Sequence, residues 1–128
     1  MFVADTHSFL WFLTNDERLG SEAKEIFRLC DSGEETIAIP SIVLLECLYV
    51  CERKKVSVEF KEILARISGS FNYLIYPLDE EVVFECSKIL KIKDPHDRII
   101  VATAKLLNAP VITKDEEIKN SGTAEIVW

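Results

Sequence analysis

Short apolar runs that suit β-strands alternate with longer helical patterns along the chain, and this alternation constrains the fold most strongly. Strands are expected at residues 2–5, 36–39, 74–78, 111–113 and 125–127. Helices are expected between them, at residues 6–14, 21–31, 41–54, 57–68, 80–92 and 96–108. Alternation of this kind predicts an α/β domain whose mostly parallel sheet, of four or five strands, is covered by helices on both faces.

Capping residues support several of the predicted helix starts. Ser21, Ser41 and Asp79 are each expected to act as the N-cap of the helix that follows. Asp94 is followed by Pro95, a pairing that predicts an N-cap with proline at the first helical position.

Length and composition indicate a single globular domain. The chain has 128 residues, of which 48% are hydrophobic and 29% charged. No apolar stretch approaches the ~20 residues that cross a membrane. The first residues carry no positive charge and include an acid, so no secretory signal is expected and the predicted location is the cytoplasm.

The four cysteines and the net charge restrict the kinds of functional site that the chain can contain. Cysteine spacing matches no zinc-binding pattern, so buried free thiols are expected. The net charge of −7 argues against a protein that wraps nucleic acid non-specifically. It leaves room for a nuclease, because a bound divalent cation reverses the local sign of an acidic pocket.

Two acidic residues lie in surroundings that are otherwise apolar. Asp5 is the only charged residue among the first fifteen, and Glu46 is the only one between positions 40 and 51. A carboxylate in such surroundings is costly unless a cation or a hydrogen bond receives it. Asp5 alone is open between an N-cap and a catalytic group. Glu46 lies too far into its helix to cap it, so metal binding or catalysis is favoured over an ion pair with a distant arginine.

Three further aspartates fall where predicted strands end or helices begin. Asp94 and Asp97 lie at the start of the last long predicted helix, and Asp115 follows the fourth predicted strand. Ligands of open α/β sheets bind outside the carboxyl ends of the strands, so these acids are expected to converge with Asp5. Asp97 is preferred for the cluster and Asp94 for the cap, although spacing alone does not decide between them. Asp115 is either another cap or a fourth carboxylate.

Several carboxylates at one edge of a sheet predict a metal site. Like charges within a few ångströms raise one another's pKa values, and a hard divalent cation such as Mg²⁺ or Mn²⁺ relieves that repulsion. Such ions activate water and stabilise the charge that develops in phosphodiester hydrolysis. The acids therefore indicate a metal-dependent phosphodiester hydrolase.

The chain resembles PIN domains, in particular the toxins of VapBC-type toxin–antitoxin pairs. The resemblance is carried by FVADTHSFLWFL, SIVLLECLYVCERKKV and DPHDRIIVATAKLLNAPVITKDEEI, and it covers nearly the whole sequence. Its elements are an aspartate after the first strand, a glutamate on a later helix, an aspartate heading an apolar helix, and T-x-D after the fourth strand.

This resemblance implies a three-layer α/β/α sandwich that forms one nuclease domain over residues 1–128. It implies Mg²⁺- or Mn²⁺-dependent endonucleolytic cleavage of RNA that leaves a 5′-phosphate. A small antitoxin protein is the implied partner, and a homodimer the implied assembly. No membrane association is expected.

The resemblance also assigns roles by position. Asp5, Glu46 and Asp97 would be the core acids and metal ligands, and Asp115 would be a fourth acid that acts through water. The supporting residues beside them would be Thr6, Thr113 and Asp94.

The sequence does not decide the roles of the other polar residues near these acids. Arg98 would either neutralise a carboxylate or contact a substrate phosphate. His7 and His96 adjoin the proposed acids and could ligate Mn²⁺ or Zn²⁺, although His7 is expected to be a polar neighbour at the rim. The basic cluster at residues 53–55 is expected mainly to stabilise the C-terminal end of the helix that precedes it.

Two other functions compete with the toxin ribonuclease. One is a ribonuclease of the same fold with a housekeeping role in RNA processing. The other is a non-catalytic α/β binding module whose acids only cap helices. That module would gain no stability from divalent metal, whereas a metal-dependent nuclease would.

Overall fold

The computed structural model describes all residues of the chain, 1–128, and places five strands in one parallel sheet. The strands are β1 (Phe2–Ala4), β2 (Ile37–Pro40), β3 (Tyr73–Tyr76), β4 (Val111–Ile112) and β5 (Ile126–Val127). Their spatial order is β3-β2-β1-β4-β5, and every neighbouring pair is parallel. All five predicted strands are present, and the α/β class is confirmed.

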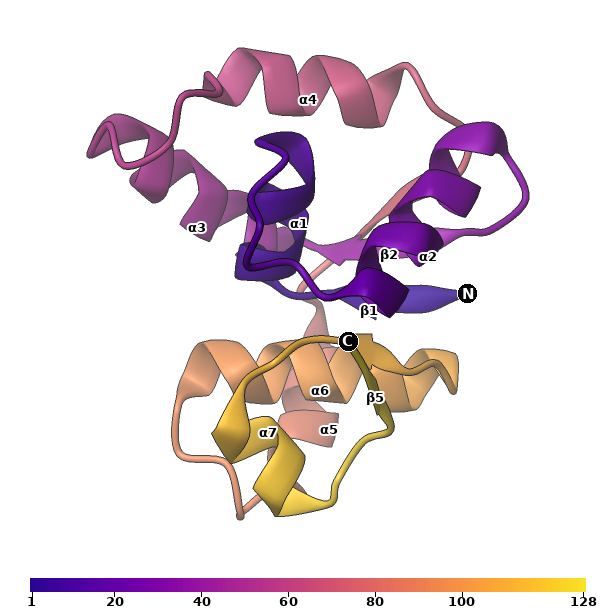
Figure 1. Cartoon of the computed structure of the whole chain (residues 1–128). Helices are drawn as coiled ribbons and strands as arrows, with labels where there is room; N and C mark the ends of the chain where they lie inside the picture. Colours follow the sequence, from indigo (N-terminus) through magenta and orange to yellow (C-terminus); the bar gives the residue numbers. More distant parts are fainter.

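Seven helices cover the two faces of this sheet and give three layers (Figure 1). On one face lie α1 (Thr6–Leu13), α2 (Ser21–Ser32), α3 (Ser41–Glu52) and α4 (Phe60–Ser68). On the other face lie α5 (Glu80–Cys86), α6 (Pro95–Leu107) and α7 (Glu116–Ser121). The three central strands β1, β2 and β4 are largely buried between the helices, whereas the edge strand β3 exposes Leu74 and Ile75.

Helices α2 and α3 begin where they were predicted, but two of the predicted N-caps are wrong by one residue. The N-cap of α2 is Gly20 rather than Ser21, and the N-cap of α3 is Pro40 rather than Ser41. The hydroxyl of Ser41 instead donates a hydrogen bond of 2.9 Å to the carbonyl oxygen of Tyr76, in the neighbouring strand β3. The Ser41 hydroxyl is therefore engaged in a tertiary contact and does not cap α3.

Asp79 caps α5 as predicted, but this helix is shorter than the pattern indicates. The Asp79 carboxylate accepts a 3.0 Å hydrogen bond from the backbone N–H of Val82. The helix ends at Cys86, whereas the prediction extended it to residue 92. Ile89 and Ile92 are nonetheless fully buried, in the smaller core between α5, α6 and α7. Because these two side chains are buried, residues 87–92 have the apolar pattern of a helix although they do not form one.

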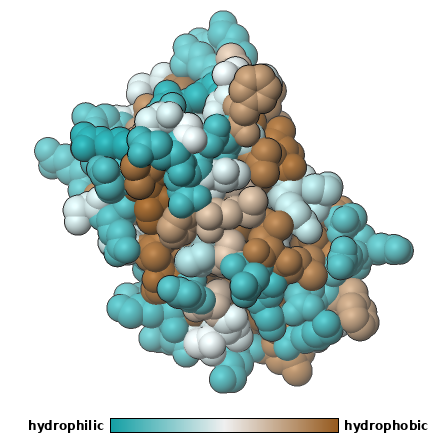
Figure 2. Space-filling model, turned by 90° about the vertical axis from the view of Figure 1, so that its right-hand side faces the viewer, coloured by the Kyte–Doolittle hydropathy of each residue, from teal (hydrophilic) through white to brown (hydrophobic).

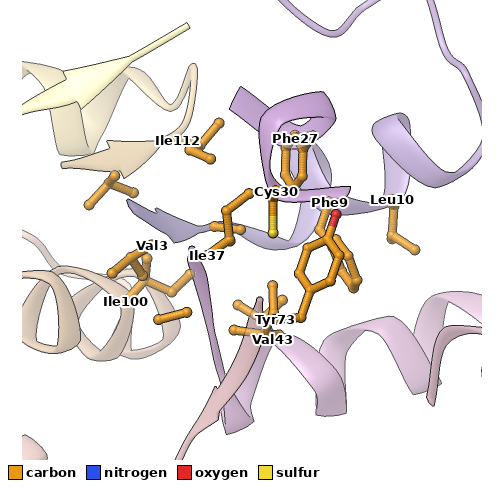
Figure 3. Packing of buried hydrophobic residues seen from close by; sticks show 14 of the residues in the cluster. Val3, Phe9, Leu10, Phe27, Cys30, Ile37, Val43, Tyr73, Ile100 and Ile112 are labelled. Carbon is orange, nitrogen blue, oxygen red and sulfur yellow. The ribbon is translucent and has the colours of Figure 1, made fainter. Parts of the chain in front are cut away.

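The main core lies mostly between the sheet and the α1–α4 layer, and it also includes Ile100 and Ala104 of α6 (Figure 3). Phe27 of α2 stacks on two aromatic side chains of α1, with ring centroids 4.7 Å from Phe12 and 6.2 Å from Phe9. Tyr73 of β3 packs beside Phe9 at 5.9 Å. The apolar run in α1 is therefore largely core.

All four cysteines are free, and burial makes their thiols poor acids. Cys30 and Cys47 are fully buried, whereas Cys51 and Cys86 are partly buried. Burial raises the pKa of Cys30 to about 11 and that of Cys47 to about 12. The expectation of buried free thiols holds for these two, which pack as small apolar side chains.

The surface mixes polar and apolar side chains. Figure 2 shows hydrophobic residues running discontinuously between hydrophilic ones on the face that it presents. Every helix is too short or too polar to cross a lipid bilayer.

The sheet order places a ligand site at one particular edge. From the central strand β1 the chain builds outward through β2 to β3, and it returns on the other side of β1 to form β4 and β5. Strand order thus reverses between β1 and β4, where open α/β sheets hold their ligands at the carboxyl ends. Asp5 and Thr113 follow directly on these two strands.

Candidate active site

A cavity of about 660 Å³ opens at this edge, and carboxylates dominate its lining. The acids come from segments far apart in the sequence but adjacent in the fold. They are Asp5, Glu46, Asp94, Asp97, Asp115 and Glu116. The structure thus brings together every acid that the sequence analysis proposed for the site.

Asp5 both caps a helix and contributes to the cavity. Its Oδ1 accepts a 2.7 Å hydrogen bond from the backbone N–H of Ser8, which caps α1. Only 8% of Asp5 is exposed, and this burial raises the pKa of its carboxyl, against the opposing effect of hydrogen bonds from Thr113 and Ser8. The two roles that the sequence left open are therefore compatible.

Glu46 reaches the cavity from α3 and is held by two polar neighbours. Its Oε1 accepts a 2.9 Å hydrogen bond from the hydroxyl of Thr6, and its Oε2 lies 3.4 Å from Nδ1 of His96. No arginine pairs with Glu46, and Thr6 takes the supporting position expected of it.

Asp94 and Asp97 divide between them the two roles that the sequence could not assign. The Oδ1 of Asp94 accepts hydrogen bonds from the backbone N–H groups of His96 at 2.8 Å and of Asp97 at 3.1 Å. Asp94 is therefore the N-cap of α6, and Asp97 lies in its first turn. Burial, followed by the charges of nearby acids, chiefly Asp115 and Asp94, raises the pKa of Asp97 to about 7. Both causes disfavour the ionised form of Asp97.

Asp115 also combines a cap with a place in the cavity. Its Oδ1 accepts a 2.9 Å hydrogen bond from the backbone N–H of Ile118 at the start of α7. The fully buried hydroxyl of Thr113 accepts a 3.0 Å hydrogen bond from the backbone N–H of Asp115 and is hydrogen-bonded to Asp5. Thr113 therefore links the two acids from beneath the cavity.

The oxygen donors of this cavity fit a hard divalent cation. Mg²⁺ and Mn²⁺ prefer carboxylate oxygens, and the charge that raises the pKa of Asp97 is what such an ion would neutralise. No three His, Cys, Asp or Glu side chains are already gathered at metal-binding distances. Mg²⁺ keeps several of its waters in proteins, so some of these acids would contact such an ion through water rather than directly. Asp97, Asp5 and Glu46 are the residues that would hold it.

Three basic or imidazole groups differ in their relation to the cavity. His7 and His96 line it, whereas Arg98 does not. The Arg98 guanidinium donates a hydrogen bond to the carbonyl oxygen of Ile92, so it holds the loop before α6. The basic residues 53–55 at the end of α3 are also outside the cavity.

Four lining residues were not expected from the sequence, namely Trp11, Ile100, Lys114 and Glu116. Trp11 lies in the apolar helix α1 and is only 7% exposed, so its sequence surroundings do not distinguish it from a core residue. Lys114 lies between Thr113 and Asp115, and its position directly beside a predicted site acid was the available signal.

Comparisons with solved structures agree with this fold at low sequence identity. A toxin–antitoxin complex from Klebsiella pneumoniae superposes with a TM-score of 0.72 at 18% identity, covering 100% of this chain and 97% of that one. Mycobacterium tuberculosis VapC20, described as a sarcin–ricin loop cleaving toxin, gives 0.73 at 15% identity, with 100% of both chains covered. FitAcB from Neisseria gonorrhoeae gives 0.71 at 17% identity, covering 100% of this chain and 97% of the other.

Comparison by sequence gives a family but no individual relative. No curated protein matches the chain by sequence. The PIN domain family matches residues 2–122, which is nearly the whole chain and includes every acid of the cavity. The chain therefore belongs to the PIN domain family.

Proposed function

We propose that the protein is a Mg²⁺- or Mn²⁺-dependent endoribonuclease, and that it is the toxin of a toxin–antitoxin pair. The observation that carries the proposal is the convergence of six carboxylates on one cavity at the reversal point of the sheet. Helices that follow parallel strands begin at this edge, so the caps Asp5, Asp94 and Asp115 would gather here in any case. Glu46 and Asp97 cap no helix, and their presence in the cavity is what favours a metal site over capping alone.

In this proposal Asp5, Glu46 and Asp97 hold the metal, and Asp115 acts through water. A bound divalent ion supplies an activated water and stabilises charge on the phosphate oxygens. Thr6 orients Glu46 through its hydrogen bond, and Thr113 does the same for Asp5 from below. Backbone N–H groups at three helix starts fix Asp5, Asp94 and Asp115, so the acids lie on rigid elements.

The toxin assignment is supported by the structural neighbours. Several of them are toxin–antitoxin complexes, including VapBC2 from Rickettsia felis, solved with DNA of its promoter. We accordingly propose a small antitoxin as partner and a homodimer as the active assembly. A housekeeping nuclease of the same fold would lack a neighbouring antitoxin gene, so the reading frame beside this one distinguishes the two.

The test is cleavage of a mixed RNA substrate by the wild type in Mg²⁺, in Mn²⁺ and in EDTA. We expect cleavage with either metal and none in EDTA. Asp5→Asn should abolish cleavage but keep the fold, because an asparagine side chain caps a helix as well as aspartate does.

Asp79→Asn is the matched control. Asp79 caps α5 through the same kind of hydrogen bond, to Val82, but lies outside the cavity. This variant should cleave RNA as the wild type does. The proposal is wrong if the wild type cleaves no RNA with either metal, or if Asp5→Asn cleaves at the wild-type rate.

A further inference from the structure

Lys114 is the only lysine or arginine that lines the acidic cavity. Six carboxylates share that lining, yet Lys114 forms no salt bridge or hydrogen bond with any of them. Coulomb attraction draws a flexible lysine toward so much negative charge. Its ammonium is therefore held in another position.

The indole of Trp11 holds this ammonium. The Nζ of Lys114 lies 4.5 Å from the ring centroid, a cation–π geometry. Trp11 is itself fixed in place, since its ring packs against His7 at 5.5 Å and against Trp128 at 5.8 Å. The platform is thus rigid, and Lys114 keeps its hydrogen-bond donors free.

Arg18 lies over the same ring, but unlike Lys114 it is paired with an acid. Its Cζ is 4.6 Å from the Trp11 centroid, and its guanidinium makes two hydrogen bonds to the carboxylate of Asp16, at 3.0 and 2.8 Å. The positive charge of Lys114 makes a small contribution to lowering the pKa of Asp16, although the two side chains form no salt bridge. Of the two cations on Trp11, only Lys114 is both in the cavity and unpaired.

We propose that Lys114 binds a backbone phosphate of the RNA at the mouth of the cavity, and that Trp11 is the residue that positions it there. The inference rests on the proposed nuclease function and deepens it. An RNA that approaches six carboxylates in a chain of net charge −7 is repelled, so one fixed cation at the rim has a large share in docking it. Lysine contacts of this kind position the strand without reading its sequence.

The test measures binding of a short fluorescein-labelled single-stranded RNA by fluorescence anisotropy with Mg²⁺ present. Asp5→Asn serves as the parent, so that RNA is not cleaved during the measurement. Adding Lys114→Met, which keeps the length of the side chain, should weaken binding about fivefold for every RNA sequence and reduce the slope of log Kd against log salt by about 0.7. Lys114→Arg should restore both.

Lys119→Met is the matched control, since Lys119 is an exposed lysine of α7 outside the cavity. It should leave both the affinity and the salt slope unchanged. In the cleavage assay, Lys114→Met in the otherwise wild-type protein should raise KM more than it lowers kcat.

The outcomes separate the two proposals. If the wild type cleaves RNA but Lys114→Met binds with unchanged affinity and salt slope, the role of Lys114 is wrong and the nuclease stands. An equal loss in Lys119→Met would also overturn it, because the effect would then be one of net charge. If the wild type neither binds nor cleaves RNA, both proposals fail.

Discussion

The hydroxyl of Thr6 donates a 2.9 Å hydrogen bond to Oε1 of Glu46 and joins the first helix, α1, to α3 across the mouth of the cavity. Glu46 has no cation with a permanent charge beside it, and only His96 contacts its other oxygen. The hydrogen bond from Thr6 is therefore the main contact that fixes the orientation of this carboxylate, beside the longer contact with His96.

Thr6→Val should lower the rate of RNA cleavage about tenfold, because Glu46 loses the hydrogen bond that orients it and valine keeps the shape of threonine. Thr6→Ser retains the hydroxyl and should retain most of the rate. Single-turnover kinetics at saturating RNA measure the effect. Equal rates for wild type and Thr6→Val would show that Glu46 needs no such support.

Without metal, Asp97 should contribute an unfavourable free energy to folding that grows as the pH rises from about 4 to about 7. In the folded state the pKa of Asp97 is about 7, raised by burial and by the neighbouring acids from the ordinary 3.8. Between these values the folded state binds a proton that the unfolded state has lost, so the free energy of unfolding falls with rising pH. Above pH 7 the full penalty is present.

Asp97→Asn removes that penalty because asparagine does not ionise. The variant should be about 1–2 kcal/mol more stable than the wild type at pH 8 in EDTA, a figure reduced for the partial exposure of the site and its helix-start position. The difference should vanish near pH 4. Urea unfolding at both pH values measures it, and a wild type that is more stable than the variant at pH 8 would contradict this electrostatic picture.

Much of the site follows from the sequence because isolated charges in apolar segments are costly. Asp5 and Glu46 are identifiable in this way without any structure. The parallel sheet follows from the alternation of strand and helix patterns, and its topology then brings the carboxyl ends of β1 and β4 together. Local pattern and global fold thus agree at these positions.

Other features depend on contacts that no local pattern contains. Lys114 lies on Trp11 although about a hundred residues separate them, and Ser41 bonds to β3 instead of capping α3. Asp94 and Asp97 could not be assigned by spacing because both fall at the first turn of one helix. Only the direction of their side chains, set by the fold, distinguishes the cap from the free acid.

Divalent metal should stabilise the wild type and act through Asp97. At neutral pH, Mn²⁺ at about a hundredfold excess over its dissociation constant should add about 2.7 kcal/mol to the free energy of unfolding. Asp97→Asn should lose most of that gain, whereas Asp79→Asn should keep it because Asp79 lies outside the cavity. Thermal melts with and without Mn²⁺ measure the gain. A wild type whose Tm does not respond to metal would favour the non-catalytic module.

Gly20→Ala should destabilise the protein by about 1–3 kcal/mol through overpacking. A Cβ at Gly20 would lie 2.5 Å from the backbone carbonyl carbon of Trp128 and 2.6 Å from its indole. Because Trp128 also packs on Trp11, the substitution should change the tryptophan fluorescence spectrum as well. Unchanged stability and an unchanged spectrum would mean that Trp128 moves away from the added methyl group at no cost in free energy.

The central claim is that the acids of this cavity direct water, not the RNA's own 2′-hydroxyl, at the phosphodiester bond. Attack by water leaves linear phosphate ends, whereas attack by the 2′-hydroxyl leaves a 2′,3′-cyclic phosphate. Mass spectrometry of the RNA fragments distinguishes the two. We predict 5′-phosphate and 3′-hydroxyl ends, formed only with Mg²⁺ or Mn²⁺. Fragments that end in a 2′,3′-cyclic phosphate and form equally well in EDTA would contradict the account.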